Sequence, residues 1–118
     1  MANKNKVLIL ESVKKAIEEL EPPLQARIKV AQEALASGDF QSVYTKSLQG
    51  PIRELIVRPY RLIFFLKERT IYFVGIFRKK TAKTPLQAIR NSLYIYKTIQ
   101  KITKSSKKSS HENGSQKK

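Results

Sequence analysis

Residues 52–77 read IRELIVRPYRLIFFLKERTIYFVGIF, and this stretch decides the fold. Within it lie three runs rich in β-branched and aromatic residues, at 52–57, 60–67 and 70–77. Arg58-Pro59 and Glu68-Arg69 separate the runs, and such short links between apolar runs are typical of hairpins. The stretch therefore predicts three strands in an antiparallel meander.

The middle run is apolar at every position from residue 62 to residue 66 (LIFFL). A strand of this kind is covered on both faces, so it is predicted to lie at the centre of the sheet. Arg61 then stands as a charge at the start of a buried strand. Gly75, inside the third run, predicts a β-bulge or a close approach by another group.

The N-terminal part predicts a short strand at residues 7–10 (VLIL) followed by two helices. Residues 12–20 and 24–35 carry apolar side chains at steps of three and four, which is the spacing of one helix face. Ser12 is predicted to cap the first helix, and Gly38 to close the second. Pro22-Pro23 separates the two helices, so this region is expected to be a helical hairpin.

A last helix is predicted after residue 84. Thr84 suits its N-cap, Pro85 its first turn, and Gln87 the third position of a capping box. Residues 86–99 then carry one apolar face. From residue 104 to residue 118 there is no apolar side chain, so we expect one domain over 1–103 and a disordered basic tail over 104–118.

These elements indicate an α/β chain of the α+β kind. Its expected parts are an N-terminal strand, a helical hairpin, an antiparallel sheet of about four strands and a C-terminal helix. With 118 residues there is room for one modest core, and none for a separate substrate domain. The apolar run at 7–10 is too short for a signal peptide or a membrane span, so a cytoplasmic protein without membrane contact is expected.

The chain has a formal charge of +15, and the excess is uneven. Bases and acids number seven and six in residues 1–50, eleven and two in 51–100, and six and one in 101–118. Because self-repulsion at this charge is costly, a polyanionic partner is expected, either nucleic acid or an acidic protein.

In the second half of the chain the bases fall at strand ends and in one loop, namely at Arg53, Arg58, Arg61, Arg78, Lys79, Lys80 and Lys83. In a meander the end of one strand lies beside the start of the next. Several of these bases are therefore predicted to gather at one edge of the sheet. A cluster of Arg forks and Lys point charges favours phosphate recognition.

The sequence also narrows the chemistry. It has no Cys, its one histidine is His111 in the predicted tail, and it lacks a Gly-rich phosphate loop or a spaced carboxylate pair. We therefore expect no metal and no cofactor. RNA cleavage by the RNA's own 2′-hydroxyl suits such a chain, because cations hold the phosphate in line and stabilise the charged phosphorane.

Four segments resemble the RelE/ParE superfamily of type II toxins: 46–50 (KSLQG), 53–55 (REL), 60–65 (YRLIFF) and 75–85 (GIFRKKTAKTP). The chain is most similar to the HigB-like, phage-derived subgroup, over roughly residues 7–96. The resemblance implies a curved antiparallel sheet flanked by helices. It also implies a toxin that arrests growth by cutting mRNA, usually on the ribosome and without metal, and that a cognate antitoxin neutralises.

By position, the resemblance implies catalytic roles for Arg61, Lys79, Lys80 and Arg53. Arg61 matches the phosphate-stabilising arginine of the central strand. Lys79 and Lys80 match basic residues that follow the last strand. Arg53 matches a further cation on the strand before the central one. Contacts to the RNA or rRNA backbone are implied for Lys46, Arg58, Arg78 and Lys83.

Two other functions stay open. A ParE-like toxin shares the fold and inhibits DNA gyrase by a protein contact, but such chains tend to lack the concentrated basic set. A nucleic-acid-binding module without activity usually exposes aromatic side chains on its sheet as stacking platforms. In this chain the aromatic side chains of the predicted strands and last helix are expected to pack in the interior or against helices. They are Phe64, Phe65, Phe73, Phe77, Tyr60, Tyr72, Tyr94 and Tyr96. Glu54 is expected to pair with a neighbouring Arg or Lys.

Overall fold

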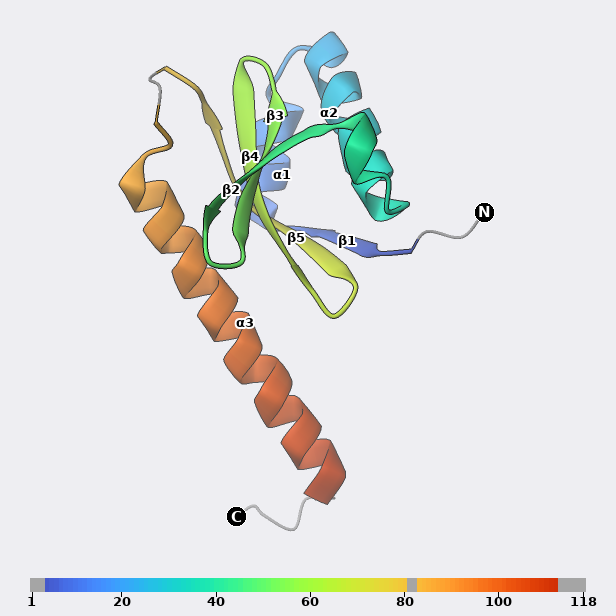
Figure 1. Cartoon of the computed structure of the whole chain (residues 1–118), viewed down its shortest axis with the longest axis vertical. Coiled ribbons are helices and arrows are strands. Elements are labelled where there is room, and N and C mark those ends of the chain that lie inside the picture. Colours follow the sequence, from blue (N-terminus) through green and yellow to red (C-terminus); the bar gives the residue numbers. More distant parts are fainter. Residues whose placement is uncertain (1–3, 81–82, 113–118) are drawn as a thin grey trace.

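A computed structural model of the chain describes residues 4–80 and 83–112, with side chains as far as residue 102. Five strands form one sheet in the order β1-β5-β4-β3-β2, and helices lie on both of its faces (Figure 1). The strands are β1 (Lys6–Ile9), β2 (Tyr44–Gln49), β3 (Ile52–Val57), β4 (Tyr60–Lys67) and β5 (Thr70–Arg78). The mixed α+β class is as the sequence predicts.

The predicted meander is confirmed. β3 and β4 have the predicted bounds and β5 ends one residue later, and both β3–β4 and β4–β5 pair antiparallel. β4 is the middle strand of the five, and its residues 62–65 are buried. A strand that is apolar on both faces thus lies at the centre of the sheet, where helices cover both faces.

Two features of the sheet differ from the prediction. There are five strands where about four are expected, because β2 forms an additional edge strand. Its sequence, YTKSLQ, is polar at most positions and largely exposed, so it carries little apolar signal. The sheet is also not purely antiparallel, since β1 pairs parallel with β5, with Val7 opposite Ile71.

A β-bulge in β5 confirms the prediction made from Gly75. Ile63 of β4 pairs with Gly75, but the next residue, Phe64, pairs with Phe73, so Val74 is the extra residue. The insertion reverses the alternation beyond it. Phe77 therefore turns toward the same face as its cross-strand partner Arg61, and Lys79 is the next residue on that face.

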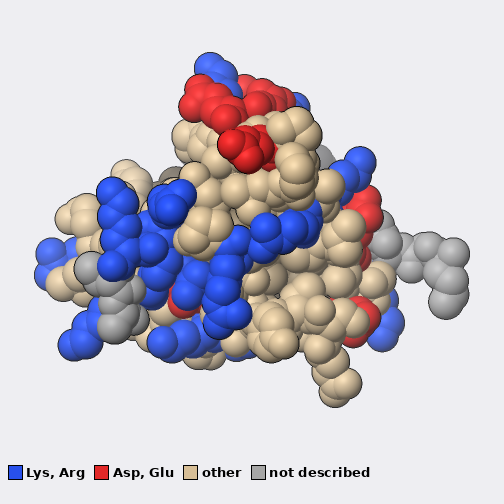
Figure 2. All heavy atoms as spheres, turned by 90° about the horizontal axis from the view of Figure 1, so that it is seen from above, with Lys and Arg blue, Asp and Glu red and all other residues tan. Residues whose placement is uncertain are grey.

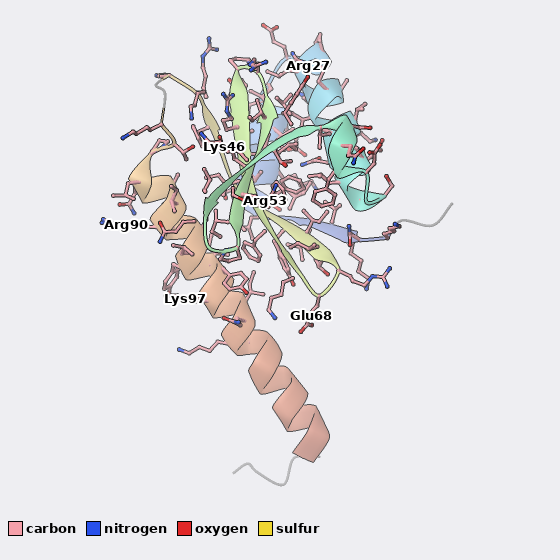
Figure 3. All side chains as sticks on the ribbon, viewed as in Figure 1. Arg27, Lys46, Arg53, Glu68, Arg90 and Lys97 are labelled. Carbon is pink, nitrogen blue, oxygen red and sulfur yellow. The ribbon has the colours of Figure 1, made fainter. Side chains whose placement is uncertain are left out.

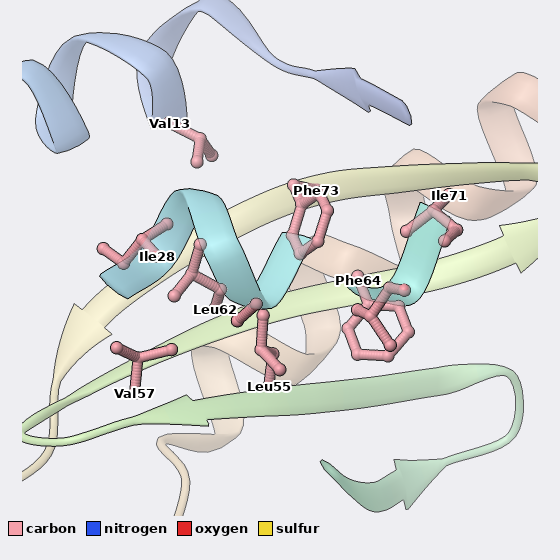
Figure 4. Close-up of a cluster of buried hydrophobic side chains, with 10 residues drawn as sticks. Val13, Ile28, Leu55, Val57, Leu62, Phe64, Ile71 and Phe73 are labelled. Carbon is pink, nitrogen blue, oxygen red and sulfur yellow. The ribbon is translucent and has the colours of Figure 1, made fainter. Parts of the chain in front are cut away.

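The helical hairpin covers one face of the sheet. It consists of α1 (Glu11–Glu18) and α2 (Pro22–Ala36), and a short 3₁₀ turn, η1 (Phe40–Ser42), follows it. Side chains from both helices and from β3, β4 and β5 form one apolar cluster (Figure 4). Its fully buried members include Leu35, Leu62, Phe64 and Phe73.

The ends of the hairpin differ in one place from the prediction. Ser12 does not cap α1, because the helix begins at Glu11 and its N-cap is Leu10, two residues before Ser12. The Leu10 amide still donates to Phe73 O (3.1 Å) and continues the parallel pairing, while the Leu10 carbonyl accepts from Lys14 N (2.9 Å) and starts the helix. Gly38 has φ +84° after the end of α2, as predicted for a closing glycine.

The long helix α3 (Leu86–Glu112) covers the opposite face. It packs over a second cluster built on Ile52, Ile63, Phe65 and Val74, where the Phe65 and Tyr96 rings meet edge to face at 4.9 Å. Beyond this cluster α3 extends past the edge of the sheet (Figure 1). None of the helices in the described part of the chain is long and apolar enough to cross a membrane.

α3 also continues past residue 103, where the sequence predicts that order ends. Residues 104–112 of the predicted tail have a helical backbone, and residues 113–118 lie outside the described residues. Residues 103–112 have no apolar side chain, which is why the sequence carries no packing signal for a helix there. The boundary at 103 between a packed domain and a tail stays a prediction.

Most of the aromatic predictions are confirmed. Phe64, Phe65 and Phe73 are fully buried, and Tyr72 stacks on Phe65 at 5.0 Å. Tyr94 is the exception, because 73% of it is exposed on the outer side of α3.

Candidate active site

The alternation of side chains along the strands divides the predicted basic residues between the two faces of the sheet. Lys46 of β2 lies opposite Glu54 of β3, which lies opposite Ile63 of β4, and Ile63 belongs to the cluster under α3. Arg61 is two residues before Ile63 and shares its face. Lys46, Glu54 and Arg61 therefore lie on the side of the sheet that α3 covers.

Glu54 is the centre of this group. Its side chain is 1% exposed, and its Oε2 lies 3.7 Å from Nε of Arg61, whose side chain is 13% exposed. Its other carboxylate oxygen, Oε1, accepts a hydrogen bond from the Thr84 hydroxyl at 2.7 Å. A buried carboxylate needs such partners, because it has lost its water.

Thr84 connects this carboxylate to the loop after β5. Its hydroxyl oxygen also accepts from Nζ of Lys79, at 3.4 Å. The predicted capping box does not form, since the Thr84 side chain turns to Glu54 and Gln87 donates to Asn91 instead. Thr84, just before α3, thereby links Lys79 to the carboxylate that also pairs with Arg61.

Arg61 keeps donors that can meet a ligand. Nη1 makes a long contact of 3.4 Å to the carbonyl of Tyr60, and Nε has no hydrogen-bond partner within the described residues. The guanidinium is thus recessed and oriented by Glu54 while most of its hydrogen-bonding capacity is unused. Such a group can stabilise a phosphate that carries extra negative charge.

A basic surface adjoins this group at the end of the sheet. The amide of Lys79 donates to Pro59 O at 2.8 Å, and Nη2 of Arg27 on α2 donates to Arg58 O at 2.7 Å. These two contacts bring α2, the β3–β4 turn and the loop after β5 together. We call the side chains there the basic surface, and they are Arg27, Arg58, Arg78, Lys79 and Lys80.

Figure 2 views the molecule from this end and shows Lys and Arg side chains across the middle of the face. Arg27, Arg58, Arg78 and Lys80 are exposed. Lys83 is also exposed, one residue before Thr84. The predicted gathering of Arg58, Arg78, Lys79 and Lys80 at one edge of the sheet is thus found.

Arg53 does not join them. It is next to Glu54 on β3, so its side chain faces the opposite side of the sheet. Its cross-strand partner there is Phe64, which packs against the helical hairpin. Its Nη1 and Nη2 donate to Ser47 Oγ and Thr45 Oγ1 of β2, each at 2.9 Å. Figure 3 labels Arg53 and Lys46 on these neighbouring strands. The structure therefore separates Arg53 from Arg61, Lys79 and Lys80.

Two members of the arrangement are absent from the predicted site set. Thr84 is expected only as a helix cap, and Arg27 lies on a helix far from the basic segment in sequence. For Arg27 the sequence carries no signal, because its place depends on how α2 packs beside the β3–β4 turn. The expectation that Glu54 pairs with a neighbouring base is confirmed, since it pairs with Arg61.

Sequence comparison now places the chain. Residues 15–97 match the profile of a family described as phage derived protein Gp49-like (DUF891). The chain belongs to the Gp49-like family. This match includes α2, strands β2 to β5 and the first part of α3, and so all of the residues around Glu54. A comparison with curated protein sequences finds no match for this Gp49-like protein.

Solved structures give the same fold at low sequence identity. The archaeal RelE–RelB complex from Pyrococcus horikoshii OT3 aligns with a TM-score of 0.61 and 17% identity, over 67% of the Gp49-like chain and 99% of the matched chain. The RelB–RelE antitoxin–toxin complex from Methanococcus jannaschii aligns with a TM-score of 0.52 and 19% identity, over 75% of the Gp49-like chain and 96% of the matched chain. The Gp49-like protein thus has a RelE-like fold, as its sequence motifs imply.

Proposed function

We propose that this Gp49-like protein is the toxin of a type II toxin–antitoxin system and that it cleaves mRNA on the translating ribosome without a metal ion. The observation that carries the proposal is the group around Glu54. There, one buried carboxylate orients Arg61 directly and Lys79 through Thr84, beside an exposed basic surface. The RelE-like fold and the family motifs support the toxin assignment.

In the proposed reaction the RNA supplies the nucleophile. The 2′-hydroxyl of one nucleotide gives up its proton to water and its oxygen attacks the adjacent phosphorus, and the bond from phosphorus to the 5′-oxygen of the next nucleotide breaks. The products are a 2′,3′-cyclic phosphate and a 5′-hydroxyl, which takes up a proton. The protein has to hold the three reacting atoms in line and stabilise the charge on the phosphorane.

Arg61 is the proposed phosphorane-stabilising residue, because Glu54 fixes its side chain through Nε at 3.7 Å and the side chain adjoins the basic surface. Lys79 is proposed to contact the same phosphate group or its leaving oxygen, since Thr84 ties it to the same centre. Glu54 and Thr84 act as positioning residues. Arg53 is left out of the proposed catalytic set because it lies on the other face of the sheet.

The remaining bases are proposed to hold the polynucleotide. Lys80, Arg78 and Arg58 continue the basic surface away from Arg61, and Lys46 lies opposite Glu54 on the site's face. Lys83 belongs to the same loop. Phosphate contacts of this kind fix the register of an RNA chain without reading its bases.

A cognate antitoxin is the proposed protein partner. The two solved structures described above are both complexes of RelE with a RelB antitoxin. An acidic antitoxin segment suits the basic surface of this chain, since complementary charge speeds association and selects the partner.

Primer extension on an actively translated message after induction tests the activity. We expect new 5′ ends inside the coding sequence, and we expect them to vanish for the same purified RNA without ribosomes. Intact messages together with inhibited DNA supercoiling would contradict the proposal and favour a ParE-like toxin. RNA binding without any cleavage would favour a non-catalytic binding protein.

A further inference from the structure

One face of α3 carries a line of basic residues. Arg90, Tyr94, Lys97 and Lys101 follow one another at steps of four, three and four, so all four lie on the same face of the helix. The same steps lead to two further lysines, at positions 104 and 108, where the backbone is still helical. We call the line from Arg90 to Lys101 the α3 stripe. Figure 3 labels Arg90 and Lys97 along the helix.

The α3 stripe lies opposite the face by which α3 packs on the sheet. On the packing face Ser92 is 2% exposed, and Ile95 and Ile99 join the second apolar cluster. The three bases of the stripe are exposed, and Tyr94 is 73% exposed. None of the four side chains has a hydrogen bond or an ion pair within the described residues. The stripe is therefore a solvent-facing surface whose donors are all available.

The charges of α3 also have one sign. Residues 86–111 contain six Lys and Arg and no Asp or Glu, whereas residues 11–36, which include α1 and α2, contain four bases and five acids. Like charges four residues apart, such as Lys97 and Lys101, destabilise a helix when nothing neutralises them. A helix face that is merely solvated usually mixes both signs. The pattern therefore favours a polyanion bound to the α3 stripe.

The shape of the stripe favours the backbone of double-helical RNA over an acidic protein. From Arg90 to position 108 the line is about 27 Å long, at 1.5 Å per residue. Phosphates form such a long regular row of charges, whereas a protein partner usually also buries an apolar core. The stripe has no aliphatic residue, and the hydroxyl of Tyr94 can donate to a phosphate. A convex helix does not enclose a single strand, but it can lie along the wide, shallow minor groove of an RNA duplex.

We propose that the α3 stripe is a second RNA surface, which binds the phosphate backbone of double-helical RNA through its three bases, with Tyr94 as a further hydrogen-bond donor. The stripe starts six residues after Thr84 and leads along α3 past the edge of the sheet (Figure 1). It is thus separate from the group around Glu54. The proposal rests on the proposed function for the source of the duplex, which is the RNA of the translating ribosome. The message is then bound at Arg61 while ribosomal RNA is bound on α3.

Fluorescence anisotropy with the full chain and a blunt-ended RNA duplex of about 16 base pairs tests this surface. The stripe variant combines Arg90→Gln, Lys97→Gln and Lys101→Gln, because Gln removes the charge and forms helices nearly as well. We expect this variant to bind the duplex about tenfold more weakly or worse at physiological salt. The slope of log affinity against log salt should fall by about 2–3, since each phosphate contact to a duplex contributes about 0.9.

A matched control separates the stripe from the net charge. The control variant combines Lys14→Gln, Lys15→Gln and Lys29→Gln, which removes the same charge from exposed lysines of the helical hairpin. Its duplex affinity should stay within about twofold of the wild type, because salt screens charges that do not contact the RNA. Tyr94→Phe removes only a hydroxyl and should weaken binding about threefold, the loss for one hydrogen bond. Circular dichroism checks that each variant keeps the helix content of the wild type.

Each outcome supports or overturns the α3 stripe as an RNA surface. Equal losses of affinity for the stripe and control variants would overturn it, because net charge alone would then explain the binding. Unchanged duplex affinity of the stripe variant, together with cleavage of translated messages, would overturn the stripe and leave the proposed nuclease standing. A loss confined to the stripe variant, without any cleavage by the wild type, would support the stripe while the proposed activity fails. Lost binding of a polyglutamate peptide with unchanged duplex affinity would overturn it and make this face of α3 a protein-docking surface.

Discussion

At the scale of residues, the site depends on Glu54, the one acidic side chain that is buried in the described part of the chain. Its two oxygens have separate partners: Arg61 is at 3.7 Å from one and the Thr84 hydroxyl is at 2.7 Å from the other. A carboxylate so enclosed is stable only while it is paired. The same contacts that stabilise Glu54 also fix the cation that is proposed to meet the phosphate.

Removing Arg61 is therefore expected to affect both activity and stability. Arg61→Ala should lower the cleavage rate at least ~100-fold, since a stabilising cation is lost. It should also lower the free energy of unfolding by about 3 kcal/mol, because Glu54 stays buried without its ion pair. Denaturant unfolding and single-turnover cleavage measure the two effects.

The double variant Glu54→Gln with Arg61→Ala separates these effects. A neutral amide at residue 54 no longer needs a cation, so much of the lost stability should return while cleavage stays abolished. If the stable double variant cleaves RNA at the wild-type rate, Arg61 has no catalytic role.

Arg53 gives the opposite expectation. Arg53→Ala loses hydrogen bonds to Thr45 and Ser47 and should lower the free energy of unfolding by about 1–2 kcal/mol. The cleavage rate, measured per folded molecule, should stay within about twofold of the wild type. A loss as large as that expected for Arg61→Ala would contradict the placement of Arg53 outside the site.

Which residues form the site stays a prediction, but the sequence anticipates part of their arrangement for physical reasons. Arg61 is recognisable in the sequence because a charge at the start of a buried strand needs either an ion-pair partner or a ligand. Arg53 is misleading because two adjacent strand residues, such as 53 and 54, face opposite sides of the sheet, and position along the chain does not say which side holds the site. Thr84 has two uses for one hydroxyl, and only the tertiary contact with Glu54 decides between them.

At the scale of elements, the bulge in β5 determines which side chains reach the site. Because Val74 is inserted between the pairs made by Phe73 and Gly75, the residues after it change faces. Phe77, and Lys79 after it, thereby come to the face of Arg61. Gly75 predicts the bulge from the sequence. The sequence does not show that the bulge determines the face on which Lys79, four residues later, lies.

β2 and the end of α3 show what a sequence pattern leaves out. β2 is an edge strand, and its polar sequence is ordered by pairing with β3 and not by burial. α3 continues through Lys- and Ser-rich sequence because no proline or glycine interrupts it before Gly114. Patterns of apolar residues report packing, and they give no signal for a polar edge strand or for a helix without apolar residues.

Truncation after Thr103 tests the role of this last part of the chain. The removed residues contain no apolar side chain, so the free energy of unfolding should change by less than ~0.5 kcal/mol. They contain five lysines, so the salt dependence of RNA binding should become shallower. A large loss of stability would show that the end of α3 belongs to the packed domain.

At the scale of the whole molecule, the +15 charge has an uneven and informative distribution. The basic surface lies at the end of the sheet where the β3–β4 turn and the loop after β5 meet, and Figure 2 shows most of the visible acidic side chains away from the band of bases. The recessed Arg61 lies beside this surface. Under the proposed function, an RNA chain that binds this surface lies next to Glu54, the buried carboxylate that orients Arg61.

The chemistry of the RNA ends tests this account most directly. Messages cleaved after induction should carry 2′,3′-cyclic phosphates upstream of each cut and 5′-hydroxyls downstream, so the downstream fragments should accept label from a polynucleotide kinase without prior phosphatase treatment. The folded Glu54→Gln, Arg61→Ala variant should give no such fragments. Fragments with 5′-phosphates, or equal fragment yields from this variant and the wild type, would contradict the claim that the RNA's own 2′-hydroxyl attacks at Arg61.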